Sequence, residues 1–268
     1  TGVPTSVNLY YTLNGGTSWT LAGNDVSVDG SYAWVIPASG TYGWYASAMG
    51  GGSVELSPPV GGTAPEATSY IIDIVSPTII VTSPINGASG IATSENIVIT
   101  FSEAMNTGSL AYTIVPNPDG LSVAWSGGNT IVTISHNVLA VGTSYTVTVT
   151  ACKDLAGNSL IGGAVPNPWT FTTISAASAT ATGPTGGPTT VAGVTITYTY
   201  TGTPTSVNIY YTTNGGTVWT LWGNDATVNG NYAVTLTSIG TYGWLAQAVG
   251  GGSVEPNPPI NGMPPESG

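Results

Sequence analysis

The stretch TGVPTSVNLYYTLNGGTSWTLAGND at residues 1–25 returns as TGTPTSVNIYYTTNGGTVWTLWGND at residues 201–225. The match continues without a gap to residues 66 and 266, with roughly two-thirds of the positions identical, which is the signature of an internal repeat. In the second copy, Val207, Ile209 and Tyr211 alternate with polar neighbours before the Asn-Gly-Gly at 214–216. This period of two, followed by a glycine turn, predicts a β-hairpin.

The duplication defines the organisation of the chain, because the stretch between the two copies has no counterpart of its own. We expect repeat A at residues 1–74, a different module B at 75–175, and repeat A′ at 176–268. Neither repeat shows a helical period, and short strands recur about every ten residues, which is typical of a β-sandwich. The predicted class is all-β, built of tandem sandwiches.

One face of a later strand is expected to form the core of each repeat. Tyr242, Trp244, Ala246 and Ala248 share a face in repeat A′, as their equivalents Tyr42, Trp44, Ala46 and Ala48 do in repeat A. The opposite face, with residues 45, 47 and 49 or their equivalents, is expected to be partly exposed.

Two resemblances follow from longer motifs. SVNLYYTLNGGTSWT with YAWVIPASGTYGWYASAMGGGSVELSPP resembles the fibronectin III/Ig-like modules of prokaryotic surface proteins. SPINGASGIATSENIVITFSEAMN, VGTSYTVTVTACKDLAGNSL and WTFTT resemble the bacterial Ig-like domain family of S-layer and other surface proteins over most of 76–174. The second resemblance implies a spacer or assembly module in a large extracellular protein.

Module B also has a consistent core of its own. Its alternating apolar residues are expected to lie inside a sandwich of about seven strands; they are Ile97, Ile99, Phe101, Tyr145, Val147, Val149, Trp169 and Phe171. The segment Asp154 to Asn158 is interpreted as a turn in which Asp and Asn accept local hydrogen bonds.

The charge balance excludes several classes of partner. The chain has one Lys or Arg, Lys153, against 12 Asp and Glu, a formal charge of −11. It therefore cannot neutralise phosphates, and we expect neither nucleic acid nor an anionic membrane as partner. No apolar run is long enough to span a membrane. A neutral surface of Thr, Ser, Asn and Gly instead favours close packing between copies.

The two repeats differ in the strands that flank them. The aligned stretch 201–266 is preceded by TTVAGVTITYTY at 189–200, a predicted strand with no equivalent before the aligned stretch 1–66. The stretch 1–66 is followed by a predicted strand at 69–74, whereas the sequence after 266 ends at Gly268. We therefore expect each sandwich to lack a strand, which would expose core and edge groups. Either the chain is a window from a longer repetitive polypeptide, which we favour, or a neighbouring chain donates the strand.

The sequence offers little for catalysis, and we expect no enzyme, no catalytic residue and no cofactor. His136 is a single histidine in a predicted loop, which is more often inert than a general base. Cys152 is a single cysteine, interpreted as a small apolar side chain near a strand end. Gly50-Gly51-Gly52 lacks the following helix that a phosphate-binding loop requires.

Two weaker hypotheses concern ligands. Calcium would need several oxygen ligands, and six acidic residues lie in predicted turns or near module joints: Asp25, Asp29, Glu66, Asp73, Glu103 and Asp154. No EF-hand spacing is present, so turn capping is favoured and no metal site is assigned. Tyr10, Tyr210 and Trp222 are expected to be exposed rings that could stack on sugars, although position 222 is Ala22 in the other copy.

Together these observations predict an extracellular structural protein of the cell surface, a repeat unit of a filament, S-layer or stalk assembled head-to-tail. Its partners are expected to be copies of itself or adjoining repeats of a longer chain. The alternative is an adhesin or carbohydrate-binding module of a secreted multidomain protein, with surface glycans as ligands.

Overall fold

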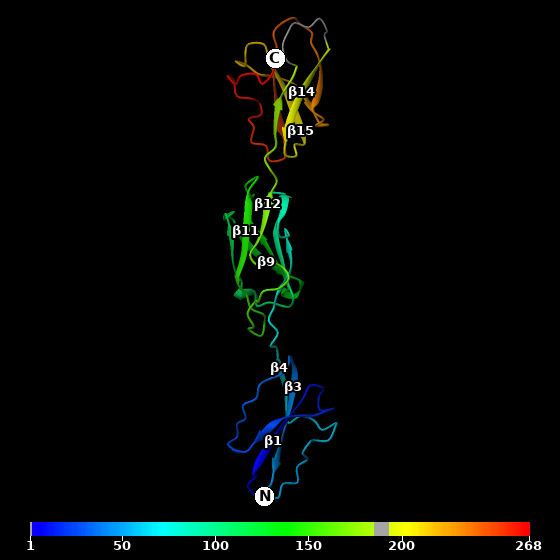
Figure 1. Cartoon of the computed structure of the whole chain (residues 1–268), viewed down its shortest axis with the longest axis vertical. Helices are drawn as coiled ribbons and strands as arrows, with labels where there is room; N and C mark the ends of the chain where they lie inside the picture. The colour runs from blue at the N-terminus through cyan, green and yellow to red at the C-terminus, as the bar shows by residue number, and fades with distance from the viewer. Residues whose placement is uncertain (1, 185–192) are drawn as a thin grey trace. The chain divides into compact units, whose positions relative to one another are not determined.

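The computed structural model describes residues 2–184 and 193–268, in which the regular structure consists of β-strands and two short 3-10 turns. These ranges contain no α-helix, so the all-β class expected from the sequence is confirmed. The chain forms two compact units, one of residues 1–78, 102–110 and 151–161 and one of residues 79–101, 111–150 and 162–268. Figure 1 labels their main strands.

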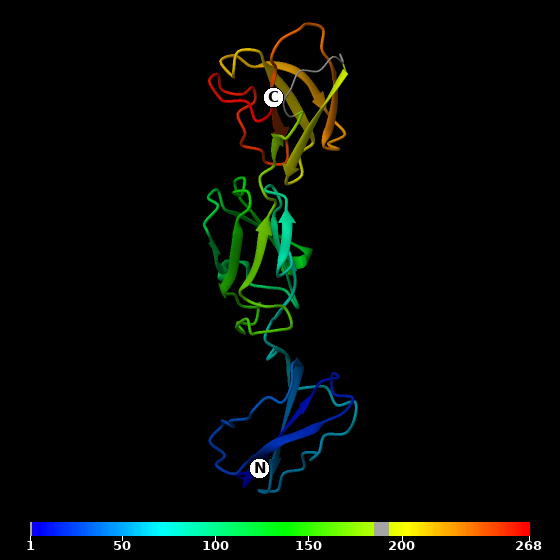
Figure 2. The same ribbon diagram turned by 45° about the horizontal axis from the view of Figure 1, so that its top comes forward.

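Repeat A, in the first unit, has one antiparallel sheet in the order β2-β1-β3-β4. Its strands are β1 Ser6–Thr12, β2 Thr20–Asp25, β3 Gly40–Met49 and β4 Ala67–Ile72. The strand expected at 69–74 is thus present as β4 and pairs with β3, with Tyr42 opposite Tyr70. Figure 2 shows this blue sheet flanked by loops and not by a second sheet.

Two loops of module B belong to the first unit because they are hydrogen-bonded to the segment that follows β4. The Ser102 N–H donates to the Thr78 carbonyl at 2.9 Å, and the Ile161 N–H donates to the Pro77 carbonyl at 3.0 Å. The Asn158 side chain reaches further and donates to the Asp73 carbonyl at 3.0 Å. The 3-10 turn η1, Thr107–Ser109, lies in the first of these loops.

The rest of module B is a sandwich of two four-stranded sheets in the second unit. One sheet has the order β5-β7-β10-β9 and the other β6-β12-β11-β8. The strands are β5 Ile79–Ser83, β6 Ala88–Ile91, β7 Ile97–Phe101, β8 Ala111–Val115, β9 Ser122–Ser126, β10 Ile131–Ser135, β11 Ser144–Ala151 and β12 Trp169–Thr173, with the 3-10 turn η2 at Gly127–Asn129. All eight residues expected in its core are buried, which confirms that expectation.

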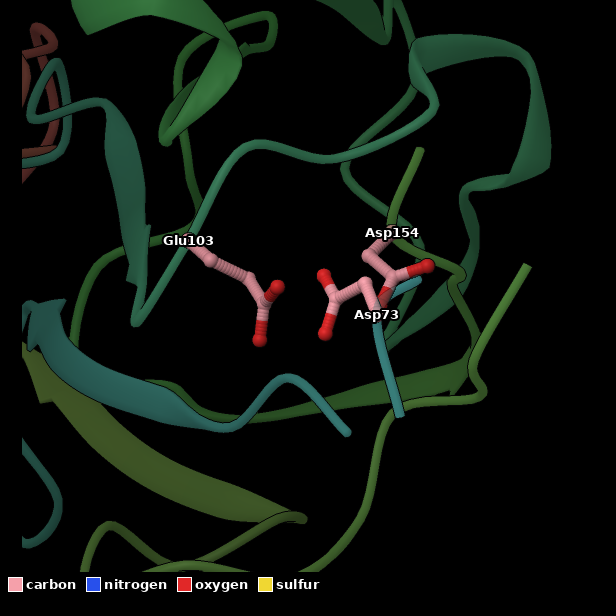
Figure 3. A group of neighbouring side chains, drawn as sticks. All are labelled: Asp73, Glu103 and Asp154. Atoms are coloured by element: carbon pink, nitrogen blue, oxygen red, sulfur yellow. The ribbon is translucent and has the colours of Figure 1, made fainter. Parts of the chain in front are cut away.

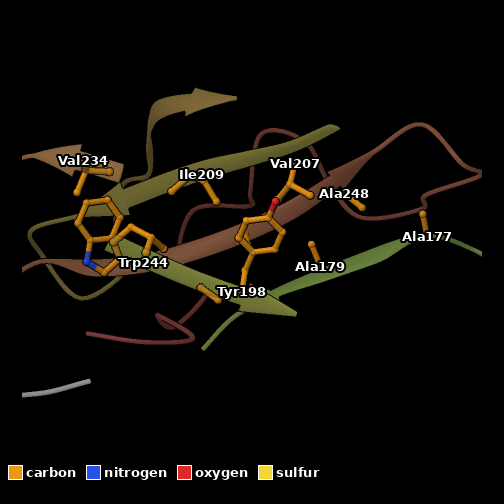
Figure 4. Packing of buried hydrophobic residues seen from close by; sticks show 11 residues of the cluster. Ala177, Ala179, Tyr198, Val207, Ile209, Val234, Trp244 and Ala248 are labelled. Carbon is orange, nitrogen blue, oxygen red and sulfur yellow. The ribbon is translucent and has the colours of Figure 1, made fainter. Parts of the chain in front are cut away.

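Repeat A′ consists of two three-stranded sheets, β13-β14-β17 and β16-β15-β18. The strands are β13 Ser178–Ala181, β14 Gly193–Thr201, β15 Ser206–Thr212, β16 Thr220–Asp225, β17 Asn231–Thr235 and β18 Gly243–Val249. The strand expected at 189–200 is β14 where it is described, and residues 189–192 lie outside the described residues. Figure 4 shows the core between these sheets, with Tyr198 of β14 pointing toward β15 and β18.

The expected core face is confirmed in repeat A′, but the opposite face is more buried than expected. Leu245 and Gln247 are both nearly inaccessible, and the chain after β18 folds back over Leu245. Met263 packs against Tyr210, Trp219 and Leu245. A period of two assigns side chains to faces, but it does not show that a later loop covers the second face.

Candidate functional site

The same sheet face is closed in repeat A′ and open in repeat A. Val207 and Ile209 of β15 are 0% exposed, whereas their equivalents Val7 and Leu9 are only half-buried. Ala246 of β18 is also 0% exposed, whereas its equivalent in β3, Ala46, is exposed. The face expected to form the core of both repeats therefore does so fully only in repeat A′.

Strands β13 and β14 cover this face in repeat A′. β13 contributes small inward side chains, with Ala179 and Ala181 in the core, and β14 contributes the larger Ile196 and Tyr198. β14 also pairs with β17, for example with Thr195 opposite Ala233. Among the described residues of repeat A nothing corresponds to β13 and β14, and residues 31–35, which align with β17, form no strand.

Trp34 covers one end of the open face in repeat A. Its ring centroid lies 4.8 Å from that of Tyr11, 5.2 Å from that of Trp44 and 5.9 Å from that of Tyr42. This aromatic group buries Tyr42 completely. The end of the face around Leu9 and Ala46 remains accessible.

Two glutamates join β18 to β13 in repeat A′, where the two strands belong to different sheets. The Glu266 carboxylate accepts hydrogen bonds from the Ala246 N–H of β18 at 3.0 Å and the Ala181 N–H of β13 at 2.6 Å. Glu255 accepts likewise from the N–H groups of Ala248 and Ala179, at 2.6 and 3.2 Å. The carboxylates thus replace a backbone ladder between these strands.

The equivalent glutamates of repeat A make only half of these bonds. Glu66 accepts from the Ala46 N–H at 3.0 Å, and Glu55 accepts from the Ala48 N–H. Both side chains are exposed. An ionised carboxylate has about four lone-pair sites, so each can accept further donors. Analysis of the sequence missed this role, although the spacing of Gly-Gly-Gly-Ser-Val-Glu is the same in both copies.

A third polar contact joins the two sheets of repeat A′. The Tyr198 hydroxyl of β14 donates to the buried Asp225 carboxylate. Burial of the Tyr198 hydroxyl, together with this hydrogen bond, raises its pKa to about 12. Burial alone would raise the pKa of Asp225, but hydrogen bonds from Thr227 and Tyr198 outweigh it and lower that pKa. In repeat A, the equivalent Asp25 accepts from the Ser27 N–H and hydroxyl.

The six acidic residues considered for calcium divide into two groups. Asp25 and Asp29 cap turns through Ser27 and Ser31, and Glu66 binds the β3 backbone. Asp73, Glu103 and Asp154 come together in the first unit, with ligand oxygens within 4.8 Å of one another. Figure 3 shows the Asp73 carboxyl between the other two.

Local bonding gives the members of this acidic cluster different roles. Asp154 is buried and accepts from the N–H groups of Gly157 and Asn158, which confirms the expected turn. Burial alone would raise the pKa of Asp154, but a hydrogen bond from the Asn158 side chain, together with these backbone bonds, outweighs it and lowers that pKa. Burial, then the negative charges of Asp73 and Asp154, raise the pKa of Glu103. Three carboxylates supply only part of the six to eight oxygens that Ca²⁺ takes.

The expected roles of His136 and Cys152 can be compared with their surroundings. The His136 ring is held by the carbonyls of Asn137 and Glu95, at 2.7 and 2.8 Å. Cys152 is buried beside the Ser109 hydroxyl, and burial raises the pKa of its thiol. A raised pKa disfavours the reactive thiolate.

The expectation of exposed rings for sugar binding is wrong for the residues proposed. Tyr10 is 6% and Tyr210 is 5% exposed, because the loop after β3 or β18 covers them; the Tyr210 hydroxyl donates to Asn257. Trp222 is half-buried and packs on Trp244 at a centroid distance of 5.7 Å. These rings fill cores and offer no stacking platform.

Comparison with known proteins gives a family match for part of the chain. Residues 73–173 match the family described as Bacterial Ig-like domain, which confirms the resemblance of module B. No curated protein matches the chain.

Three solved structures resemble the chain at low sequence identity. Domains A168-A170 from titin are 14% identical, with 94% of this chain and 86% of that chain covered and a TM-score of 0.34. The N-terminal part of the bacterial S-layer protein SbsC is 14% identical, with 61% of this chain and 45% of that chain covered and a TM-score of 0.27. The S-layer protein rSbsC(31-844) is also 14% identical, with 61% of this chain and 26% of that chain covered and a TM-score of 0.26. The chain spans less than half of either S-layer structure, and at these TM-scores the likenesses carry no further argument.

Proposed function

We propose that this chain is an extracellular structural protein of the cell surface, the repeat unit of a filament, S-layer or stalk that assembles head-to-tail. The observation that carries the proposal is the tandem arrangement of the chain, in which a bacterial Ig-like module at residues 73–173 lies between two copies of a second all-β repeat. Tandem modules of this kind are typical of extended structural proteins. The match of residues 73–173 to the bacterial Ig-like domain family supports a surface location.

The chemistry of the surface agrees with a role in assembly and not in catalysis. Only 5% of the residues are charged, so neighbouring copies can approach without burying many ions. Among the described residues, no helix has the length and hydropathy needed to cross a membrane. We assign no catalytic residue and no cofactor, and partners are copies of the chain or adjoining repeats.

A head-to-tail contact that does not close into a ring produces an open fibre. Electron microscopy of the purified full-length chain, over a range of concentrations, tests the proposal. Regular fibres or lattices are the expected result. Monomers that stay dispersed at high concentration, measured in parallel by light scattering, would contradict it. Binding of such monomers to a glycan array would instead favour the adhesin function.

A further inference from the structure

We propose that His136 is a proton-dependent clamp between two loops of module B: the doubly protonated ring ties the loops together, and loss of one ring proton loosens them. The loops are residues 92–96, between β6 and β7, and residues 136–143, between β10 and β11. The inference goes beyond the proposed function and does not depend on it, because both loops lie within one module.

The His136 ring lies between two backbone carbonyls. Its Nδ1 is 2.7 Å from the Asn137 carbonyl oxygen, and its Nε2 is 2.8 Å from the Glu95 carbonyl oxygen. Both are ordinary hydrogen-bond distances. A backbone carbonyl accepts hydrogen bonds and cannot donate them. Each contact is therefore a hydrogen bond only when the ring nitrogen concerned carries a proton.

The protonation state of the ring decides how many of these bonds exist. A neutral imidazole has one N–H group and one lone pair, whereas the imidazolium ion has two N–H groups. The neutral ring can satisfy one carbonyl, but its lone pair then faces the oxygen of the other, and two acceptors repel at this distance. The cation satisfies both carbonyls, and hydrogen bonds from an ionised donor are stronger than neutral ones. The protonated ring thus closes the clamp.

The ring reinforces a contact that the backbone already makes. The Leu139 N–H donates to the Thr93 carbonyl at 2.9 Å, which joins the same two loops. The Leu139 side chain is 2% exposed. Because the contact of His136 with the Glu95 carbonyl is a second connection between these loops, the Leu139 amide reports whether the loops are closed.

The segments that contact the 136–143 loop carry three titratable side chains. Glu95 lies in the other loop, Asp119 accepts the Asn137 N–H at its backbone carbonyl, and the Tyr145 hydroxyl accepts the Ala140 N–H. The Glu95 and Asp119 side chains are exposed, so water weakens their influence on the ring. Their negative charges favour the cation as the carbonyls do, and the experiment has to separate the two effects.

The direction of the pH dependence follows from the number of bonds. Histidine is the side chain that changes charge between about pH 5 and 8, and His136 is the single histidine of the chain. In the unfolded chain no pair of carbonyls is held beside the ring, so folding favours uptake of the second proton. Loop closure and stability are therefore greatest in mild acid and decline as the pH rises through this range.

Nuclear magnetic resonance of the full-length chain with isotope-labelled histidine tests the clamp without any substitution, because one histidine gives one set of ring signals. At pH 5 we expect two ring N–H signals that both exchange slowly with water. At pH 8 we expect a single ring N–H. Ring protons that exchange as fast at pH 5 as in the urea-unfolded chain would overturn the proposal.

Hydrogen exchange of the Leu139 amide measures the effect on the loops. Relative to the urea-unfolded chain at the same pH, its protection should be about tenfold lower at pH 8 than at pH 5, as expected for the loss of one hydrogen bond from a charged donor. A local measurement is needed because burial raises the pKa of Glu103 and of Glu266 elsewhere in the chain. His136→Gln, which does not titrate, should remove the difference, and an equal difference in this variant would contradict the clamp.

The double variant Glu95→Gln with Asp119→Asn separates the carbonyls from the carboxylates. It retains both backbone acceptors but removes the two negative charges. We expect the pH dependence of the Leu139 amide to persist in this variant. Its disappearance would show that the ring responds to charge pairing, and would overturn the assignment of the two carbonyls as the partners of the protonated ring.

Discussion

Trp34 in repeat A and Trp222 in repeat A′ make the same ring contacts from positions that do not align in the duplication. Trp34 packs on Tyr11 and Trp44, at centroid distances of 4.8 and 5.2 Å. Trp222 packs on their equivalents, at 5.1 and 5.7 Å. In the duplication, Trp34 aligns with Val234 and Trp222 aligns with Ala22. Val234 is buried in β17 beside β14. One indole is thus retained near each sheet, although the residue that provides it has changed.

This relationship predicts that Trp222 contributes to the stability of repeat A′. Trp222→Ala should lower the free energy of unfolding of this repeat by about 2–4 kcal/mol, since a large half-buried ring is removed from the core. Hydrogen exchange of β15 and β18 measures the effect. The neighbouring Leu221 is half exposed, and Leu221→Ala should change the same amides by less than about 0.5 kcal/mol. Equal effects of the two substitutions would contradict the packing described.

Tyr198 should make the stability of repeat A′ sensitive to alkali. Its folded pKa of about 12 lies above the ordinary value of 10.0, so the folded state favours the neutral phenol. The resulting stabilisation is complete below pH 10 and is lost as the pH rises through 12, a loss on the order of 2 kcal/mol. Urea unfolding at pH 9 and pH 11.5 measures it.

Tyr198→Phe should reduce the loss of stability in alkali, because the titrating hydroxyl is absent. The substitution should also destabilise the repeat at pH 9 by about 1–2 kcal/mol, because the hydrogen bond to Asp225 is removed. Tyr200→Phe is the control, since Tyr200 lies on the same strand but is exposed. An unchanged alkaline response in Tyr198→Phe would mean that another group titrates.

The carboxylate contacts between β13 and β18 predict a local effect on exchange. Glu266→Ala and Glu255→Ala should speed exchange of the Ala181 and Ala179 amides by roughly 10- to 100-fold, because hydrogen bonds to charged acceptors contribute about 1.5–3 kcal/mol. Nuclear magnetic resonance resolves the two amides. Glu55→Ala, the matched substitution in repeat A, should leave the amides of β13 in an isolated monomer unaffected.

The acidic cluster predicts that Glu103 destabilises the protein when ionised. Its folded pKa lies above the ordinary 4.5, so the penalty is absent below that value and fully present above the raised pKa. Glu103→Gln should therefore be more stable than the native chain at pH 7, and the advantage should disappear near pH 4. Urea unfolding in the presence of EDTA, which removes divalent ions, measures the difference. Glu95→Gln is the exposed control, and an equal gain there would contradict the effect of the cluster.

Cys152 should be protected from alkylation in the folded chain. Its thiol is buried and its pKa is raised, so the thiolate forms rarely. The rate of reaction with iodoacetamide should rise on the order of 100-fold or more in urea, since reaction in the folded chain requires local opening. A native rate close to the denatured one would show that the thiol is accessible.

The elements that sequence alone predicted well are those with a local signal. The hairpin around residues 214–216 and the core residues of module B follow from alternation, because strand geometry determines which side chains share a face. The burial of Tyr10 and Tyr210 could not be predicted in this way. A distant loop covers each of them, and that contact leaves no trace in the period of either strand.

The site was predictable only in outline. The duplication and its strand pattern were visible in the sequence, but the role of Glu255 and Glu266 depends on which backbone groups lie near each carboxylate. The meeting of Asp73, Glu103 and Asp154 likewise requires three loops to converge. Such arrangements are properties of tertiary structure, and a motif does not encode them.

The single basic residue of the chain, Lys153, has a consequence for how copies would respond to dissolved electrolyte. Contacts between two such chains have almost no opposite charges to weaken, while the twelve acidic groups of each copy repel those of the next. Ions in the medium shorten the range of that repulsion to about 8 Å at physiological strength. Cohesion between copies should therefore increase, and not decrease, as the salinity of the medium rises.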